Sequence, residues 1–362
     1  MKVRSAIREM KAYSPPLEGR TEGDFLLLDF SESTLPPPEG VREAIKAFLD
    51  GRGVQVYPSY SAFEKQLTAY ARVAPGQLIV TNGSDSAIQL ITSALLSPGD
   101  EMIMAKPGFA VIENCAVSIG AKVVSPLYRP PEMAFPLEDL LAAVTERTAL
   151  IVIINPNNPT GSLVTVEQIE SVLSAFPEVA VMVDEAYYEF SGLTAVPLLE
   201  RYGNLVITRT FSKAFALAGL RLGYALSNPD FITQLHKLRN PYNVNMLAVV
   251  AAGAQLAAPE GWKAYVTEVM ERAKPRVERF LSEHGVAYYP SGGNFLLVRP
   301  DDTQAAADYL REHGILVRPQ RPPVEDTFRL SIGTAADMEL FMEVFARYPG
   351  LDASAGKSEA AP

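Results

Sequence analysis

Short apolar runs alternate with amphipathic stretches along the first two thirds of the chain. Seven runs have the length and composition of buried strands: residues 78–81, 101–105, 122–125, 149–154, 179–183, 205–208 and 222–226. The stretches between them, such as residues 86–96 and 166–175, repeat apolar residues at helical spacing. This alternation predicts an α/β fold with a mostly parallel seven-stranded sheet and helices on both faces.

The pattern changes in the last third of the chain. Amphipathic helices are predicted over residues 266–282, 305–313 and 338–348, and strands over residues 286–289, 295–298, 315–318 and 328–332. The first 40 residues are rich in Pro, Glu and Ser, and the last dozen are small and polar. We therefore predict an N-terminal arm (1–40), a large domain (41–245), a smaller α+β domain (246–350) and a disordered tail (351–362).

Charge and cysteine content narrow the classes of function. The formal net charge is −10, with 42 acidic and 32 basic residues, which argues against a general nucleic-acid surface. The only cysteine is Cys115, so one chain cannot form a disulfide framework or a thiolate metal cluster. No signal-peptide core or 20-residue apolar span is present, so we expect a cytoplasmic protein without a membrane partner or a bound metal.

Polar residues follow several of the predicted strands directly, where ligands bind in sheets of this kind. A glycine turn after residue 80 opens a helix whose first amides, at Ser84 and Asp85, suit a phosphate, although an ordinary capped helix would have the same pattern. Residues 155–161, NPNNPTG, follow the fourth strand. Asp184 ends the fifth strand, and a buried carboxylate there should face a cation or a protonated heterocycle.

The sixth strand leads into the segment RTFSKAFALAGLR, which contains Lys213 and, eight residues later, Arg221. A lone lysine on a loop is more often a surface residue. Together, however, the strand-end segments offer what pyridoxal 5′-phosphate needs: a lysine for a Schiff base, a carboxylate for the pyridine nitrogen, donors for the phenolic oxygen, and a phosphate cup. The combination predicts an enzyme that uses this cofactor.

Three segments carry a resemblance to a known family. The runs NPNNPTG at 155–161, VDEAYYEF at 183–190 and RTFSKAFALAGLR at 209–221 closely resemble the histidinol-phosphate aminotransferases, within the fold-type I pyridoxal-phosphate enzymes. The resemblance extends over about residues 5 to 348. It implies a homodimer with shared active sites, an amino donor, a 2-oxo acid acceptor, and a place in histidine biosynthesis.

The resemblance assigns a cofactor role to eleven residues. Lys213 would form the Schiff base and then move the proton between the substrate and the cofactor. Asp184 would keep the pyridine nitrogen protonated, while Asn158 and Tyr187 would donate to the phenolic oxygen. Phe109 matches the aromatic that stacks on the ring. The cofactor phosphate would contact Ser84, Asp85, Thr210, Ser212, Arg221 and, from the neighbouring subunit, Tyr57.

The substrate side matches the family less closely. Arg329 corresponds to the arginine that clamps the substrate carboxylate, a task that suits its bidentate fork. Arg318 and Tyr13 occupy positions that hold the substrate phosphate, although Arg318 could equally be a surface residue, and Asn243 fits the pattern near the site. Three segments depart from the family pattern. The stretch Asn-Glu-Asn-Pro of the family appears here as SESTLP from Ser31, and its Tyr-Pro-Asp-Pro run appears as YPSY from Tyr57. Ser86 stands where the family has an acidic residue.

These departures leave the substrate open. Histidinol phosphate with 2-oxoglutarate is the first candidate pair. Aromatic amino acid aminotransferases and threonine-phosphate decarboxylases share the same cofactor residues and are the alternatives. A regulatory domain that binds the cofactor without catalysis is the rival from another class, but no basic helix-turn-helix pattern precedes residue 40.

Overall fold

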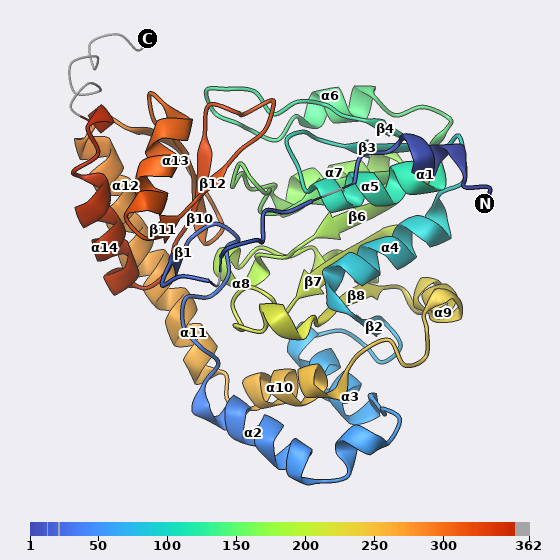
Figure 1. Ribbon diagram of the computed structural model, residues 1–362. Coiled ribbons are helices and arrows are strands. Elements are labelled where there is room, and N and C mark those ends of the chain that lie inside the picture. Colours follow the sequence, from blue (N-terminus) through green and yellow to red (C-terminus); the bar gives the residue numbers. More distant parts are fainter. Residues whose placement is uncertain (13, 21, 352–362) are drawn as a thin grey trace.

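The computed structural model describes residues 1–12, 14–20 and 22–351, which form two lobes beside each other (Figure 1). Tyr13 and residues 352–362, on which two of the sequence predictions fall, lie outside the described residues. Leu351, the first residue of the predicted tail, is buried, and its amide donates to the carbonyl oxygen of Tyr348 at 3.0 Å.

The larger lobe is built on a seven-stranded sheet. Its strands are β2 (Leu78–Thr81), β3 (Glu101–Met104), β4 (Lys122–Val124), β5 (Thr148–Ile154), β6 (Ala180–Asp184), β7 (Leu205–Thr210) and β8 (Gly223–Ser227). The spatial order is β2-β8-β7-β6-β5-β3-β4. Only β8 runs antiparallel to its neighbours, so the predicted mostly parallel sheet is confirmed.

Both faces of this sheet are buried because the strands alternate their side chains between two apolar clusters. In β5, for example, Ile151 and Ile153 belong to one cluster, whereas Leu150 and Val152 belong to the other. One face is covered by α4 (Gly83–Leu95), α5 (Ala110–Ile119) and α9 (Pro229–Leu238). The opposite face is covered by α3 (Ser61–Ala71), α6 (Leu137–Ala142), α7 (Val166–Ala175) and α10 (Met246–Ala257).

The smaller lobe contains a four-stranded antiparallel sheet in the order β12-β13-β10-β9. Its strands are β9 (Ala287–Tyr289), β10 (Phe295–Arg299), β12 (Arg318–Pro319) and β13 (Phe328–Ser331). A long helical segment leads into it from α11 (Glu260–Thr267) through a π-helical turn (Glu268–Ala273) to α12 (Lys274–Glu283). Helices α13 (Thr303–Glu312) and α14 (Ala335–Phe345) complete this lobe.

The N-terminal forty residues are tied to the smaller lobe and to the sheet edge. Helix α1 (Ser5–Glu9) lies beside α5, and α2 (Glu39–Asp50) packs on α10 (Figure 1). Strand β1 (Leu26–Leu27) pairs in parallel with β11 (Ile315–Leu316). The single strand predicted over residues 315–318 is therefore split between two sheets, because β11 pairs with the arm and β12 pairs with β13.

A substitution at Leu28 tests how much this N-terminal segment contributes to the stability of the fold. Its side chain is fully buried, its amide donates to the Leu316 carbonyl, and its own carbonyl accepts from the Ser331 amide. Leu28→Ala should lower the free energy of unfolding by about 2–5 kcal/mol, since it leaves a cavity in the core. Urea unfolding followed by circular dichroism measures this.

Leu35→Ala is the matched control, since Leu35 lies in the same segment but is 44% exposed. It should change stability by less than about 0.5 kcal/mol. Equal effects of the two substitutions would show that the segment is not part of the cooperative core.

Candidate active site

A cavity of about 590 Å³ opens where the carboxyl ends of the parallel strands meet the smaller lobe. Five of the sequence-predicted site residues line it: Phe109, Asn158, Lys213, Arg318 and Arg329. They come from the segments after β3, β5 and β7 and from the two strands β12 and β13. The fold therefore brings together residues that are up to 220 positions apart in the sequence (329 − 109 = 220).

Lys213 follows β7 and points toward the arm and the ring of Tyr187. Its Nζ donates to the carbonyl oxygen of Phe30 at 2.7 Å and lies 5.6 Å from the centroid of the Tyr187 ring. Neither contact gives the ammonium a carboxylate partner. An amine held in this way has a short path to an electrophile in the cavity, as a Schiff-base lysine requires.

Asp184 lies at the end of β6, beneath the cavity floor, and is buried. Its Oδ1 accepts a hydrogen bond from Thr208 Oγ1 at 2.8 Å. Burial raises the pKa of Asp184 to about 6, and the charges of Asp85 and Glu185 add to the rise, whereas the Thr208 hydrogen bond and Lys213 oppose it. A protonated heterocycle placed against this carboxylate would supply a positive partner in direct contact with it.

Asn158, Tyr187 and Arg329 form a chain of hydrogen bonds across the cavity floor. Asn158 Nδ2 donates to Tyr187 Oη at 3.2 Å, and Arg329 Nη1 donates to Asn158 Oδ1. Arg329 Nη2 donates to the carbonyl oxygen of Asp29 at 2.8 Å, while its buried Nε has no hydrogen-bond partner among the described residues. The guanidinium thus presents an unused donor in a buried setting, where an anionic ligand would satisfy it.

A second group of residues forms a cup at the start of α4. Arg221 Nη1 donates to Ser212 Oγ at 3.3 Å, and its Nη2 donates to Asp85 Oδ2 at 3.0 Å. Thr210 Oγ1 donates to Ser212 Oγ at 2.9 Å, so residues from the end of β7 to just before β8 meet the first turn of α4. Asn82 makes no side-chain cap to this helix, whose amino end includes Ser84 and favours an anion.

Two glycines allow this close packing. Gly83 has a φ of +72°, and a Cβ there would lie 2.6 Å from Arg221 Nη2. A Cβ on Gly223 would lie 2.4 Å from the backbone nitrogen of Ser84. Larger residues would therefore fill the cup or push β8 away from the helix. The groups present fit pyridoxal 5′-phosphate: a lysine, a buried carboxylate, an amide–phenol pair and an anion cup.

The remaining predicted residues lie farther from this centre. Tyr57 is 79% exposed and stacks on Tyr242 with ring centroids 4.4 Å apart. Asn243 Nδ2 donates to the carbonyl oxygen of Val80 at the end of β2, and its buried Oδ1 has no partner. Neither residue lines the cavity, and a role for Tyr57 in a neighbouring subunit's site stays a prediction.

Comparison with known proteins identifies the family. The family model "Aminotransferase class I and II" matches residues 24–345. The chain belongs to this family. Histidinol-phosphate aminotransferase 1 of Mannheimia succiniciproducens is 36% identical over 306 residues, covering 82% of each chain. The dihydroxyacetone phosphate transaminase Cj1437c of Campylobacter jejuni is 32% identical over 331 residues, covering 89% of this chain and 90% of the relative.

A solved structure agrees with these relatives. Histidinol-phosphate aminotransferase from Sinorhizobium meliloti, in complex with pyridoxal 5′-phosphate, superposes with a TM-score of 0.87 at 26% identity, covering 98% of each chain. The resemblance noted from the sequence and the fold-type I architecture are therefore confirmed, and the chain is an aminotransferase. Among the described residues, none of the helices has the length and hydropathy to cross a bilayer.

The aminotransferase cavity also contains groups that the sequence did not reveal. The backbone carbonyls of Asp29 and Phe30 accept from Arg329 and Lys213, so the N-terminal segment forms one wall of the site. Arg20 holds this segment in place through two hydrogen bonds to the Asp29 carboxylate, at 2.9 and 2.8 Å. Every residue has a backbone carbonyl, so the sequence does not show which carbonyls act as acceptors in a site. In this region the sequence showed only the departure from the family pattern at Ser31.

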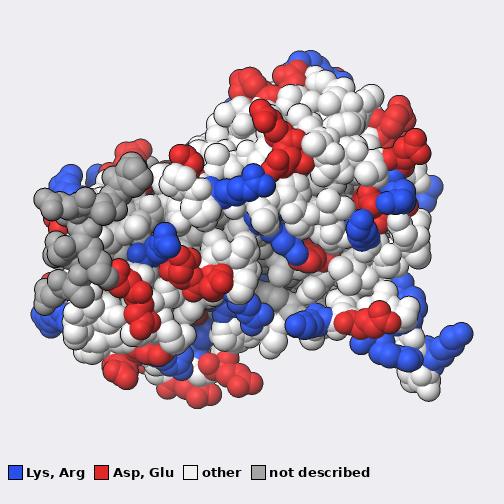
Figure 2. Space-filling model, turned by 90° about the horizontal axis from the view of Figure 1, so that it is seen from above, with Lys and Arg blue, Asp and Glu red and all other residues white. Residues whose placement is uncertain are grey.

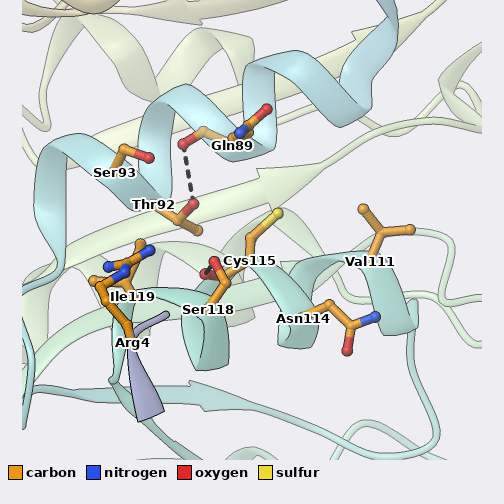
Figure 3. Close-up of a pocket in the computed structure, with 9 residues that line it drawn as sticks. All are labelled: Arg4, Gln89, Thr92, Ser93, Val111, Asn114, Cys115, Ser118 and Ile119. Carbon is orange, nitrogen blue, oxygen red and sulfur yellow. Dashed lines mark hydrogen bonds between the residues drawn. The ribbon is translucent and has the colours of Figure 1, made fainter. Parts of the chain in front are cut away.

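A separate hollow of about 500 Å³ lies between α4 and α5, beside Arg4 (Figure 3). Its lining includes Thr92 and the only cysteine, Cys115, but none of the predicted site residues. Burial raises the pKa of the Cys115 thiol to about 11, so the thiolate that a nucleophile requires is disfavoured. The chemistry of the aminotransferase therefore belongs to the cavity at the strand ends.

Asp184 should make the stability of the cofactor-free aminotransferase depend on pH. Because its pKa is raised from 3.8 to about 6 in the folded chain, the folded state binds the proton more tightly than the unfolded state does. The free energy of unfolding should thus fall as pH rises from about 4 to about 6, by about 2–3 kcal/mol from this group. Urea unfolding at several pH values measures the slope.

Asp184→Asn should remove this contribution and flatten the profile between pH 4 and pH 6 relative to the parent chain. Asp230→Asn, at the exposed first turn of α9, is the control and should leave the slope unchanged. A parent-like slope in Asp184→Asn would mean that the carboxylate is not the group that titrates in this range.

Proposed function

We propose that this aminotransferase uses pyridoxal 5′-phosphate to transfer the amino group of histidinol phosphate to 2-oxoglutarate, as a step of histidine biosynthesis in the cytoplasm. The observation that carries the proposal is that Lys213, Asn158 and Arg329 line one cavity, while Tyr187 is hydrogen-bonded to Asn158 and Asp184 ends the neighbouring strand β6. The names of the relatives and the cofactor in the Sinorhizobium meliloti structure support the same conclusion.

The bound cofactor would withdraw electrons from the substrate carbon that carries the amino group, so that the proton on this carbon becomes acidic. Lys213 would bind the cofactor and, once the substrate has displaced it, take the proton from that carbon and return it to the cofactor. Asp184 would stay ionised against the pyridine nitrogen. Asn158 and Tyr187 would donate to the phenolic oxygen and orient the ring, and Phe109 would cover it.

The cup residues Ser84, Asp85, Thr210, Ser212 and Arg221 would hold the cofactor phosphate. The amino end of α4 and the Arg221 guanidinium favour an anion there for the same electrostatic reason. The Asp85 carboxylate accepts a hydrogen bond from Arg221 and would orient its guanidinium. The favourable contact of Asp85 with the cofactor phosphate would come from its backbone amide.

The charge of the cavity favours an anionic substrate. Described side chains that line it include the cations Lys106, Lys213, Arg318, Arg321 and Arg329, but only one carboxylate, that of Glu113. Basic side chains also gather near the middle of the face seen in Figure 2. A phosphorylated donor or a dicarboxylate acceptor suits such a cavity better than an amino acid with an uncharged aromatic side chain.

The pairing of two strands strengthens this preference. Arg318 and Arg329 are direct partners across β12 and β13, and both line the cavity. Like charges that face each other across an antiparallel pair repel, so an anion placed between them would relieve the repulsion. The phosphate of the donor and the carboxylates of 2-oxoglutarate could occupy this position in alternate half-reactions.

The proposed enzyme would act as a homodimer. Tyr57 stacks on Tyr242, and both rings are exposed. Further exposed apolar side chains come from α2, the following turn and the end of α9: Leu49, Val54, Val56 and Leu238. Exposed aromatic and apolar side chains of this kind are typical of an interface. A second copy bound there would carry Tyr57 toward the neighbouring cofactor phosphate.

Replacing Lys213 tests the cofactor assignment. Purified protein mixed with pyridoxal 5′-phosphate should show a visible absorbance band that depends on the lysine, and Lys213→Ala should lack this band. Lys106→Ala is the matched control, because Lys106 lines the same cavity but pairs with Glu113 at 2.8 Å. A band that persists in Lys213→Ala would refute the proposed chemistry.

A half-reaction screen tests the substrate. The rate at which the visible band disappears should be highest with histidinol phosphate, followed by glutamate, with phenylalanine, tyrosine and phosphothreonine slower. Arg318→Gln should slow the reaction with histidinol phosphate by roughly 10- to 100-fold but change that with phenylalanine little, since a charge-assisted contact is lost. A faster reaction with phenylalanine would favour an aromatic aminotransferase, and carbon dioxide released from phosphothreonine would favour a decarboxylase.

A further inference from the structure

A buried ion pair lies on the side of β6 and β7 that faces away from the cavity. Arg209, in β7, is 2% exposed, and its Nε donates to Glu185 Oε2 at 2.8 Å. Its Nη2 lies 2.8 Å from the same oxygen and donates to Thr194 Oγ1 at 2.7 Å. Glu185 follows Asp184 directly, so the pair joins the ends of the two strands that carry the site.

The segment that follows β6 covers the pair, and Tyr224 of β8 also lies next to Arg209. Glu185 Oε1 accepts from the amide of Ala195 at 2.6 Å, and Oε2 also accepts from Thr194 Oγ1 at 2.9 Å. The Arg209 guanidinium carbon lies 3.7 Å from the centroid of the Tyr188 ring. These contacts hold both ends of the segment between residues 185 and 195, which includes Tyr187 and α8 (Tyr188–Ser191), against β7.

Strand alternation places this pair directly behind the groups that face the cavity. Thr208 and Thr210 flank Arg209 and point to the opposite side of β7. Thr208 donates to Asp184, and Thr210 donates to Ser212 beside Lys213. A shift of Arg209 along β7 would therefore move both threonines relative to Asp184.

We propose that Arg209 is a positioning residue that, through its ion pair with Glu185, fixes the Asp184 carboxylate and the Tyr187 hydroxyl relative to Lys213. The inference rests on the proposed function, because the positions it fixes are those expected around the cofactor ring. Stability alone does not require this pair. A buried ion pair can often be replaced by apolar side chains of similar volume without loss of stability.

The key experiment compares Arg209→Met, Glu185→Met and the double substitution with the parent chain. Each single change leaves one member of the pair without its partner and should lower the thermal midpoint, whereas the double change removes both charges of the pair and should recover part of that loss, since the partly buried Glu189 also loses the nearby Arg209 charge. Three functional readouts are measured in parallel: the dissociation constant for pyridoxal 5′-phosphate, the pH midpoint of the bound cofactor's visible band, and kcat against KM for the amino donor.

If Arg209 positions the site, the double substitution should fold stably and still be defective. We expect cofactor affinity to fall about tenfold, kcat to fall about 10- to 100-fold with KM little changed, and the pH midpoint of the band to move by about half a unit or more. A merely structural pair would not move the pH midpoint once stability is recovered. A double substitution with parent-like affinity, midpoint and kcat would overturn the proposal.

Two further variants keep the test decisive if the methionine variants do not fold. Thr194→Ala removes a hydroxyl that contacts both members of the pair, and it should move the same three readouts in the same direction by about threefold or less. A parent-like Thr194→Ala would count against the positioning role in that case. The control is Arg201→Met with Glu170→Gln, an exposed pair 2.5 Å apart on the same lobe, which should leave all three readouts unchanged.

Failure of this inference can be told apart from failure of the proposed function. If the parent chain does not bind pyridoxal 5′-phosphate, the proposed function is wrong and the positioning role falls with it. If the parent binds the cofactor and transaminates while the double substitution behaves like the parent, only the role of Arg209 is wrong.

Discussion

The site depends on one constraint, which is that the Asp184 carboxylate is buried at the end of a parallel strand without a cationic side chain bonded to it. Among the described residues, the Thr208 hydroxyl alone donates to its Oδ1, and burial raises the pKa of Asp184 to about 6. An isolated carboxylate in such surroundings is costly unless a positive group joins it. A pyridinium nitrogen bound against it would remove this cost, so the burial that raises the pKa of Asp184 also favours a cationic ligand there.

The second requirement is to close the cavity, and the chain meets it with backbone groups from its N-terminal segment. The carbonyls of Asp29 and Phe30 accept from Arg329 and Lys213, which belong to different lobes. Pairing of β1 with β11 and the burial of Leu28 fix this segment to the smaller lobe. The arm is thus both a structural link between the lobes and a wall of the site.

The sequence predicts the sheet well because its strands are buried on both faces and appear as continuous apolar runs. It predicts Lys213 and Asp184 for a related reason, since a polar residue directly after such a run must lie at the sheet's carboxyl edge. It does not reveal that the Phe30 carbonyl accepts from Lys213, nor the split of residues 315–318 between two sheets, which depends on the distant strand β1. Arg209 and Glu185 were visible within the motifs, but only the fold shows that they pair behind the site.

Ser31 shows how a departure from the family pattern can be accommodated. Its φ of 53° places it in the left-handed region, which asparagine adopts more readily than serine, and the resembling family has asparagine in this stretch. Two contacts with the smaller lobe hold the strained residue: its amide donates to Ser331 Oγ at 2.7 Å, and its carbonyl accepts from Asn294 Nδ2 at 3.3 Å. Both contacts use the Ser31 backbone, so they hold the turn beside Phe30 whichever side chain occupies this position. The wall formed by Asp29 and Phe30, which contacts Arg329 and Lys213, is thus held next to Ser31 by backbone contacts that do not involve the Ser31 side chain.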